Sequence, residues 1–148
     1  MSRDVTPEEA RDLIEKEGYA YVDVRSDGEF KAGHATGAYN IPLNHVGRGG
    51  VTPNDRFLAA MEKTFPKDAR LVVACQSGGR SARAVSQLEA AGYTNLVHLR
   101  SGFEGAVDPA TRQVTPGWRR KGLPVSQEAP AERTWEGIEA KLSGQGPR

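Results

Sequence analysis

The chain's single cysteine lies in the segment CQSGGRS, residues 75–81, between an apolar run and a segment with helical spacing. Gly78 and Gly79 carry no Cβ, so the backbone here can turn tightly and point its N–H groups into one concavity. A helix that follows adds the positive end of its dipole. These features predict an anion-binding loop in which Cys75, as a thiolate, is the anion.

A cysteine in such a loop is expected to be reactive. Thiols beside a helix N-terminus and an arginine, here Arg80, ionise more readily than free thiols, and the thiolate is the nucleophilic form. The alternative is that Cys75 is a small buried hydrophobic side chain at a strand end. A structural thiol has no need of two adjacent glycines, so we predict that Cys75 is a nucleophile.

The segments that flank Cys75 indicate how the loop is held. ARLVVAC, residues 69–75, is a nearly continuous apolar run, typical of a strand buried on both faces of a parallel sheet. RSARAVSQLEAAG, residues 80–92, has the spacing of a helix and ends at a glycine. Strands that alternate with helices favour an α/β domain, whose strand-to-helix loops lie at one edge of the sheet. We expect Cys75 at that edge, where ligands bind in such folds.

Other elements fit the same alternation. Residues 6–18 predict a helix with Thr6 as N-cap, Pro7 at the first helical position and a glutamate that closes a capping box. The runs YAYVDVR at 19–25 and NLVHLR at 95–100 predict short strands.

Two further helices are expected from proline positions. PNDRFLAAMEKTF, residues 53–65, predicts a helix with Thr52 as its cap and Pro53 at its start. In TPGWRRKGLP, Thr115 and Pro116 are expected to cap and begin a short helix that stops at a glycine.

Length and charge limit the domain count and the partners. The 148 residues suit one domain with one core, and 20 Lys and Arg nearly balance 19 Asp and Glu. No run of like charge suggests a nucleic-acid tail or a membrane patch, so we expect neither partner, and we expect a monomer. The N-terminal segment MSRDVTPEEARD has no apolar signal core, and a single cysteine excludes an intrachain disulfide, so the cytoplasm is the expected location.

Metal binding is not expected. The histidines are scattered along the chain, at His34, His45 and His98. They lack the paired spacing of a metal site and no cysteine pair accompanies them, so a structural or surface role is expected. The sequence predicts no metal and no cofactor.

A charged cluster follows the first strand. Asp23, Arg25 and Glu29 could carry out acid–base chemistry, but an arginine and a glutamate four residues apart beside a strand end more often pin a turn. We therefore interpret Arg25 and Glu29 as a structural pair and leave all three out of the catalytic set.

Two motifs together resemble a known family. DVRSDGEFKAGHATGAYNIP, residues 23–42, and CQSGGRS, residues 75–81, are similar to the two signatures of the rhodanese (sulfurtransferase) domain, and the resemblance covers most of residues 5–125. It implies a three-layer α/β fold with a mostly parallel five-stranded sheet flanked by helices, and it implies that Cys75 carries the transferred sulfur. The cradle implied around that sulfur consists of Gln76, Ser77, Gly78, Gly79, Arg80 and Ser81.

The chain departs from that family near its end. Residues 104–117 separate Phe103 from Trp118, which puts the wall of the pocket in question. We predict a sulfurtransferase domain over residues 1–125 and a polar tail over 126–148. The tail is expected to form a short helix that packs back on the domain through Trp135, Ile138 and Leu142.

The predicted reaction moves a sulfane sulfur from a donor such as thiosulfate to a thiophilic acceptor, cyanide or a thiol, through a Cys75 persulfide. 3-Mercaptopyruvate is a second donor candidate, and an acceptor protein in a sulfur relay is a further partner. Two alternatives are a non-catalytic binding module and a phosphatase or arsenate reductase. The latter is disfavoured because related phosphate loops place five residues between cysteine and arginine, whereas only four, Gln76 to Gly79, separate Cys75 from Arg80 here.

Overall fold

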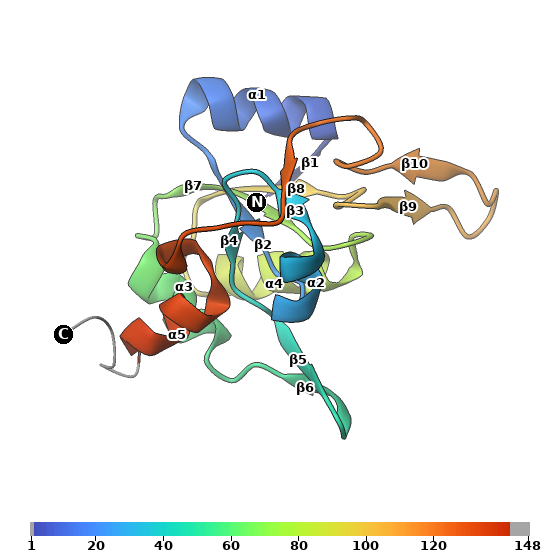
Figure 1. The fold of residues 1–148 in the computed structure, drawn as a ribbon. Coiled ribbons are helices and arrows are strands. Elements are labelled where there is room, and N and C mark those ends of the chain that lie inside the picture. Colours follow the sequence, from blue (N-terminus) through green and yellow to red (C-terminus); the bar gives the residue numbers. More distant parts are fainter. Residues whose placement is uncertain (1, 143–148) are drawn as a thin grey trace.

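A five-stranded sheet forms the centre of the molecule. The computed structural model describes residues 2–142. The strand order is β1-β8-β7-β2-β4 and all four pairings are parallel (Figure 1). The strands are β1 (Arg3–Val5), β2 (Ala20–Asp23), β4 (Tyr39–Asn40), β7 (Arg70–Ala74) and β8 (Asn95–Leu99). The predicted strands at 19–25, 69–75 and 95–100 are thus confirmed, whereas β1 and β4 were not predicted.

Helices cover both faces of this sheet. They are α1 (Pro7–Glu17), α2 (Asp27–Ala32), α3 (Phe57–Thr64), α4 (Gly79–Ala90) and α5 (Trp135–Leu142), with a 3-10 turn at Ala131–Arg133 before α5. Met61 of α3 and Leu88 of α4 share one core cluster with Val73 of the sheet. Leu13 of α1 packs with Val72 in a second cluster on the opposite face. The expected three-layer α/β architecture is confirmed.

Two helices begin with the same capping device. In α1, the Thr6 hydroxyl accepts from the Glu9 N–H at 3.1 Å and the Glu9 carboxylate accepts from the Thr6 N–H at 2.9 Å, as predicted. Ser26 and Glu29 form an equivalent box at the start of α2. Each box satisfies N–H groups that a helix start leaves without partners.

The predicted start of the helix at 53–65 is wrong. The predicted cap, Thr52, and first helical residue, Pro53, belong instead to a hairpin of β5 (Asn44–Gly47) and β6 (Gly50–Pro53), which projects from the domain (Figure 1). Asn54 ends this hairpin, because its N–H donates to the Leu43 carbonyl at 2.9 Å and its amide to the Pro42 carbonyl at 2.8 Å. These contacts hold Thr52 and Pro53 extended, and α3 starts only at Phe57.

The short helix expected after Thr115 is also absent. A second projecting hairpin, β9 (Gly105–Val107) with β10 (Val114–Pro116), contains Thr115 and Pro116 (Figure 1). Beyond it, the Trp118 N–H donates to the Gly102 carbonyl at 2.9 Å and the indole donates to the Pro124 carbonyl at 2.7 Å. Trp118 therefore ties a turn, rather than a helix, to the core. A two-residue strand, β11 (Val125–Ser126), then pairs with β3 (His34–Ala35).

The tail helix packs on the domain, as expected. Trp135 and Ile138 of α5 are buried in the core cluster that contains α3, and Leu142 packs against its edge. The chain beyond residue 125 therefore contributes to the core up to Leu142. The domain boundary at residue 125 stays a prediction, and the end of the predicted tail, 143–148, lies outside the described residues.

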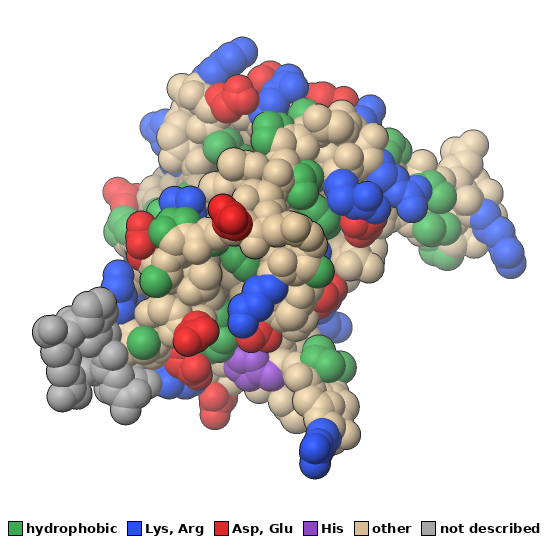
Figure 2. All heavy atoms as spheres, in the orientation of Figure 1, with side chains coloured by type: hydrophobic (Ala, Val, Ile, Leu, Met, Phe, Trp, Pro, Cys, Tyr) green, Lys and Arg blue, Asp and Glu red, His purple; other side chains and the backbone are tan. Residues whose placement is uncertain are grey.

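The surface carries mixed charge. Figure 2 shows Lys and Arg side chains interspersed with Asp and Glu on the face that it presents. Within residues 2–142, no helix is long and apolar enough to cross a membrane.

Candidate active site

Cys75 lies immediately after β7 and four residues before α4 begins, at the carboxyl edge of the sheet. Its sulfur receives the Gly78 N–H at 3.1 Å and the Ser81 N–H at 3.3 Å, and the Ser81 hydroxyl lies 3.3 Å away. The residue is only 1% exposed. N–H donors fixed at a helix N-terminus stabilise an anion that lies among them.

The backbone is turned toward the sulfur by two glycines. Gly78 has φ 104°, and a Cβ there would lie 2.4 Å from the Arg100 carbonyl oxygen. Gly102 has φ 69°, and a Cβ there would lie 2.4 Å from the Gln76 carbonyl oxygen. The Cys75 and Gln76 carbonyls accept backbone N–H groups of residues 103–105. The loop therefore packs directly on the chain that follows β8, in a conformation that side chains do not tolerate.

The six predicted cradle residues fall into three groups. Gly78 and Ser81 bond to the sulfur. Gln76, Ser77 and Gly79 are exposed, and none of them is among the hydrogen-bond partners of the sulfur. Arg80 is half-buried, and its guanidinium bonds to Glu29 rather than to the sulfur.

Arg80 is engaged by Glu29 of α2. Its guanidinium donates to the two carboxylate oxygens at 2.6 and 3.0 Å. The expected role of Arg80 as a charge within the nest is corrected: its fork is held on α2, although the charge of Cys75 is among the causes, after Glu29, that raise the Arg80 pKa. Burial raises the pKa of Glu29, but Arg80 and Ser26 outweigh it and lower that pKa to about 2. Glu29 is thus an anion that anchors the loop.

Arg25 does not pair with Glu29, in contrast to the sequence expectation. It forms a buried ion pair with Asp23, with Nη2 to Oδ2 at 2.8 Å. Its guanidinium carbon also lies 4.4 Å from the centre of the Phe103 ring. Burial lowers the pKa of Arg25, but the bonds to Asp23 raise it overall. The sequence interpretation paired Arg25 with Glu29, and the structure pairs it with Asp23 instead.

An open cavity of about 520 Å³ adjoins the loop, and we call it the loop-side pocket. Its lining includes four charged side chains, the Phe103 ring and Gln76; the charged residues are Arg25, Glu29, Glu104 and Arg119. Arg119 donates to Glu104 at 2.6 and 2.5 Å across its rim. Glu104 is the first residue of the insertion at 104–117, so the insertion does contribute to the wall of this pocket.

Comparison with known proteins agrees with this geometry. The family model described as "Rhodanese-like domain" matches residues 6–108. The chain belongs to the rhodanese-like domain family. The resemblance of its two motifs to that family is therefore confirmed.

Relatives of this rhodanese-like chain include named sulfurtransferases. It is 36% identical over 116 residues to "Thiosulfate sulfurtransferase 16, chloroplastic" of Arabidopsis thaliana, covering 78% of this chain and 86% of that protein. It is 35% identical to "Rhodanese-like domain-containing protein 9, chloroplastic" of the same plant, where the match covers 72% of this chain but only 55% of the relative. Among solved structures, Rv0390 from M. tuberculosis superposes with a TM-score of 0.69 at 29% identity, covering 86% of this chain and 98% of that one.

One neighbour of the rhodanese-like loop was missed from the sequence. His98 of β8 bonds through Nε2 to the Ser81 hydroxyl at 2.6 Å and through Nδ1 to Asp4 at 3.2 Å. The signal was the strand pairing: β8 lies beside β7, and His98 pairs with Val73, two residues before Cys75. No cluster of metal-ligating side chains occurs within residues 2–142.

Proposed function

We propose that the protein is a sulfurtransferase of the thiosulfate sulfurtransferase type that works through a Cys75 persulfide. The observation that carries the proposal is the set of polar groups around the sulfur: the Gly78 and Ser81 N–H groups donate to it at 3.1 and 3.3 Å, and the Ser81 hydroxyl lies 3.3 Å away. Preorganised donors of this kind stabilise the thiolate before attack and the negative outer sulfur of the persulfide after it. The named sulfurtransferases among the relatives support the same reaction.

The reaction takes two displacements. The Cys75 thiolate attacks the outer sulfur of thiosulfate, an S–S bond forms, and the bond to the sulfonate breaks with sulfite as leaving group. A nucleophile such as cyanide or a small thiol then attacks the outer persulfide sulfur and regenerates the thiolate. The loop-side pocket, which adjoins the loop at Gln76, is the proposed entry for donor and acceptor.

A phosphatase or arsenate reductase is disfavoured by the position of Arg80. Such an enzyme needs an arginine fork that clamps the oxygens of a tetrahedral anion. Here both nitrogens of the fork are bonded to Glu29. A non-catalytic module is disfavoured by the donors aimed at the sulfur, which a binding surface does not require.

Intact-mass measurement after treatment with a donor tests the proposal. Wild-type protein is treated with thiosulfate or with 3-mercaptopyruvate, and released sulfite or pyruvate is assayed in the same sample. We expect one added sulfur on the wild type and none on Cys75→Ser, whose hydroxyl cannot hold a transferable sulfur. No adduct with either donor would favour the binding module.

A small thiol is the physiological acceptor that we propose. Small thiols fit an open pocket of about 520 Å³, and an acceptor protein that brings its own thiolate to the loop is the second candidate. We retain the cytoplasm as the proposed location and a monomer as the proposed state; fractionation and light scattering test them.

A further inference from the structure

A continuous chain of polar contacts leads away from the sulfur into the sheet. Cys75 Sγ lies 3.3 Å from Ser81 Oγ, which lies 2.6 Å from His98 Nε2. His98 Nδ1 lies 3.2 Å from Asp4 Oδ1 on β1. The first three residues are buried, whereas the Asp4 side chain is 58% exposed. The chain thus joins a buried sulfur to a solvent-exposed carboxylate.

The chemistry of each group fixes the direction of the hydrogen bonds. A carboxylate only accepts, so the contact with Asp4 places a proton on His98 Nδ1. In the neutral ring the other nitrogen, Nε2, is then an acceptor, and the Ser81 hydroxyl donates to it. The Ser81 oxygen is left to accept from the Cys75 thiol. The Gly78 carbonyl, 3.1 Å from the same oxygen, is a longer alternative acceptor for that hydroxyl proton.

We propose that His98 stores the proton of Cys75, acting through Ser81, and that Asp4 holds the charged ring. This inference rests on the proposed function, because it supplies the thiolate which that function needs. In the step, the Cys75 S–H bond breaks and its proton passes to the Ser81 oxygen. The Ser81 proton passes to His98 Nε2. The products are a thiolate and an imidazolium, so charge and protons balance without an external base.

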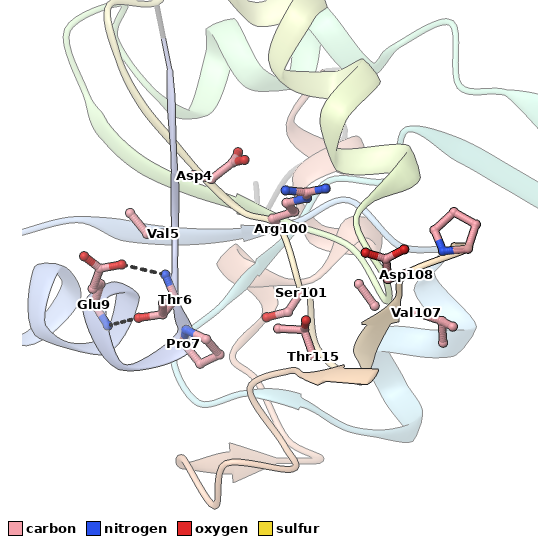
Figure 3. Close-up of a pocket in the computed structure, with 12 residues that line it drawn as sticks. Asp4, Val5, Thr6, Pro7, Glu9, Arg100, Ser101, Val107, Asp108 and Thr115 are labelled. Carbon is pink, nitrogen blue, oxygen red and sulfur yellow. Dashed lines mark hydrogen bonds between the residues drawn. The ribbon is translucent and has the colours of Figure 1, made fainter. Parts of the chain in front are cut away.

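The far end of the chain opens on a pocket of its own. Asp4 lines a cavity of about 600 Å³ between the start of α1 and the β9–β10 hairpin, which we call the N-terminal pocket. Figure 3 shows Asp4 and Arg100 close together in it, with Asp108 beyond Arg100 at the hairpin. It shares no lining residue with the loop-side pocket. The chain of contacts therefore ends at a pocket separate from the entry proposed for the sulfur donor.

His98 and Ser81 both lie in regular structure, which suits a positioning role. His98 is held in β8 by parallel pairing with β7 and β1, and its register partners are Val73 and Asp4. Ser81 is fixed in the first turn of α4, where its own N–H already bonds to the sulfur. The ring and the hydroxyl are thus held in place by regular structure rather than by a mobile loop.

The test measures how fast iodoacetamide alkylates Cys75 at neutral pH, followed by intact mass. The chain has one cysteine, so a single adduct reports the thiolate. The variants are His98→Ala, His98→Gln and Asp4→Asn, with Asp108→Asn as a matched control that removes a carboxylate from the same pocket outside the chain of contacts. Thiolate ultraviolet absorbance and melting temperature are recorded for each variant.

We expect His98→Gln to be as slow as His98→Ala, on the order of tenfold below wild type, because glutamine keeps a hydrogen bond to Ser81 but cannot take a proton. The alkylation rate of Asp4→Asn should lie between the rates of the His98 variants and of the wild type, and the rate of Asp108→Asn should match that of the wild type. Recovery of the wild-type rate and absorbance by His98→Gln would reduce the contact to a structural one and overturn the proposal.

Failure of this inference is distinguishable from failure of the proposed function. Alkylation requires no sulfur donor, so the result stands even if thiosulfate leaves no adduct. Conversely, normal sulfur loading of wild type together with an unchanged alkylation rate in His98→Gln would support sulfur transfer through Cys75 and contradict proton storage on His98.

Discussion

The guanidinium of Arg80 is bonded to both carboxylate oxygens of Glu29, at 2.6 and 3.0 Å, and so faces α2 rather than the sulfur of Cys75. This fork-to-fork contact joins the active-site loop to Glu29 of α2, which lies fifty-one residues earlier in the chain. Arg80 therefore anchors the loop, and it interacts with Cys75 electrostatically, without a hydrogen bond to the sulfur.

The Glu29–Arg80 pair should make stability depend on pH at its acidic end. The pKa of Glu29 is lowered from 4.5 to about 2 in the folded protein. A lowered folded-state pKa adds stability that is complete above 4.5 and is lost as pH falls toward 2. We expect the melting temperature of wild type to exceed that of Glu29→Gln at neutral pH, and the gap to narrow below about pH 4.5.

The Glu29 and Arg80 side chains are both partly exposed, so the ion pair should contribute only about 1 kcal/mol to the free energy of unfolding after solvent screening. Arg80→Ala should lower stability and sulfurtransfer together, and Arg80→Lys should recover only part of either, since lysine cannot form the fork. A melting-temperature difference between wild type and Glu29→Gln that stays constant with pH would contradict the ion-pair explanation.

Gly78 should not tolerate a side chain, although its neighbour should. Alanine at Gly78 needs φ 104° and places Cβ 2.4 Å from the Arg100 carbonyl oxygen, so we expect a loss of more than about 2 kcal/mol together with loss of sulfur loading. Gly79→Ala is the matched control, because nothing lies within 4 Å of a Cβ there and alanine favours the first turn of α4. Urea unfolding of both variants provides the comparison. Equal stability of the two would show that the loop is not pinned against Arg100.

Loop length should select sulfur over phosphorus. The wild type is expected to leave p-nitrophenyl phosphate intact, because Arg80 is held by Glu29 and the donors close on one sulfur atom. One glycine inserted between Gly78 and Gly79 lengthens the chain between Cys75 and Ser81, so the Ser81 N–H should move away from the sulfur and thiosulfate sulfurtransfer should fall. Measurable phosphatase activity of the wild type, or normal sulfurtransfer by the insertion variant, would reopen the phosphate alternative.

Local patterns predicted the parts of the fold that depend on local chemistry. The Thr6 capping box, the apolar strand before Cys75 and the helix after it all lie where the sequence indicated. These features are decided within a few residues of chain, by capping, apolar periodicity and glycine stops.

Long-range contacts account for the errors. Pro53 has the local signature of a helix start, but the bonds of Asn54 to the Pro42 and Leu43 carbonyls hold that segment extended. Pro116 has the same signature, and its pairing with Gly105 in a hairpin overrides it. A proline at a first helical position is permitted rather than compelled to start a helix, so tertiary contacts decide.

The candidate site shows the same division. Cys75 and its glycines were identified from spacing, whereas the partners of charged and polar side chains were not. Glu29 was assigned to Arg25 four residues earlier, but α2 begins at Asp27, so the two do not share a helix face. His98 meets Ser81 only because β8 lies beside β7 in the sheet, an order that no local pattern encodes.

Sulfur transfer by this protein depends first on whether Cys75 carries sulfur. Intact-mass spectrometry of the protein after brief treatment with thiosulfate, followed by removal of excess donor, measures this without assuming an acceptor. We predict a single added sulfur on the wild type, removed by cyanide as thiocyanate, and no adduct on Cys75→Ser. An unmodified wild type, or an equal adduct on Cys75→Ser, would contradict a persulfide at Cys75.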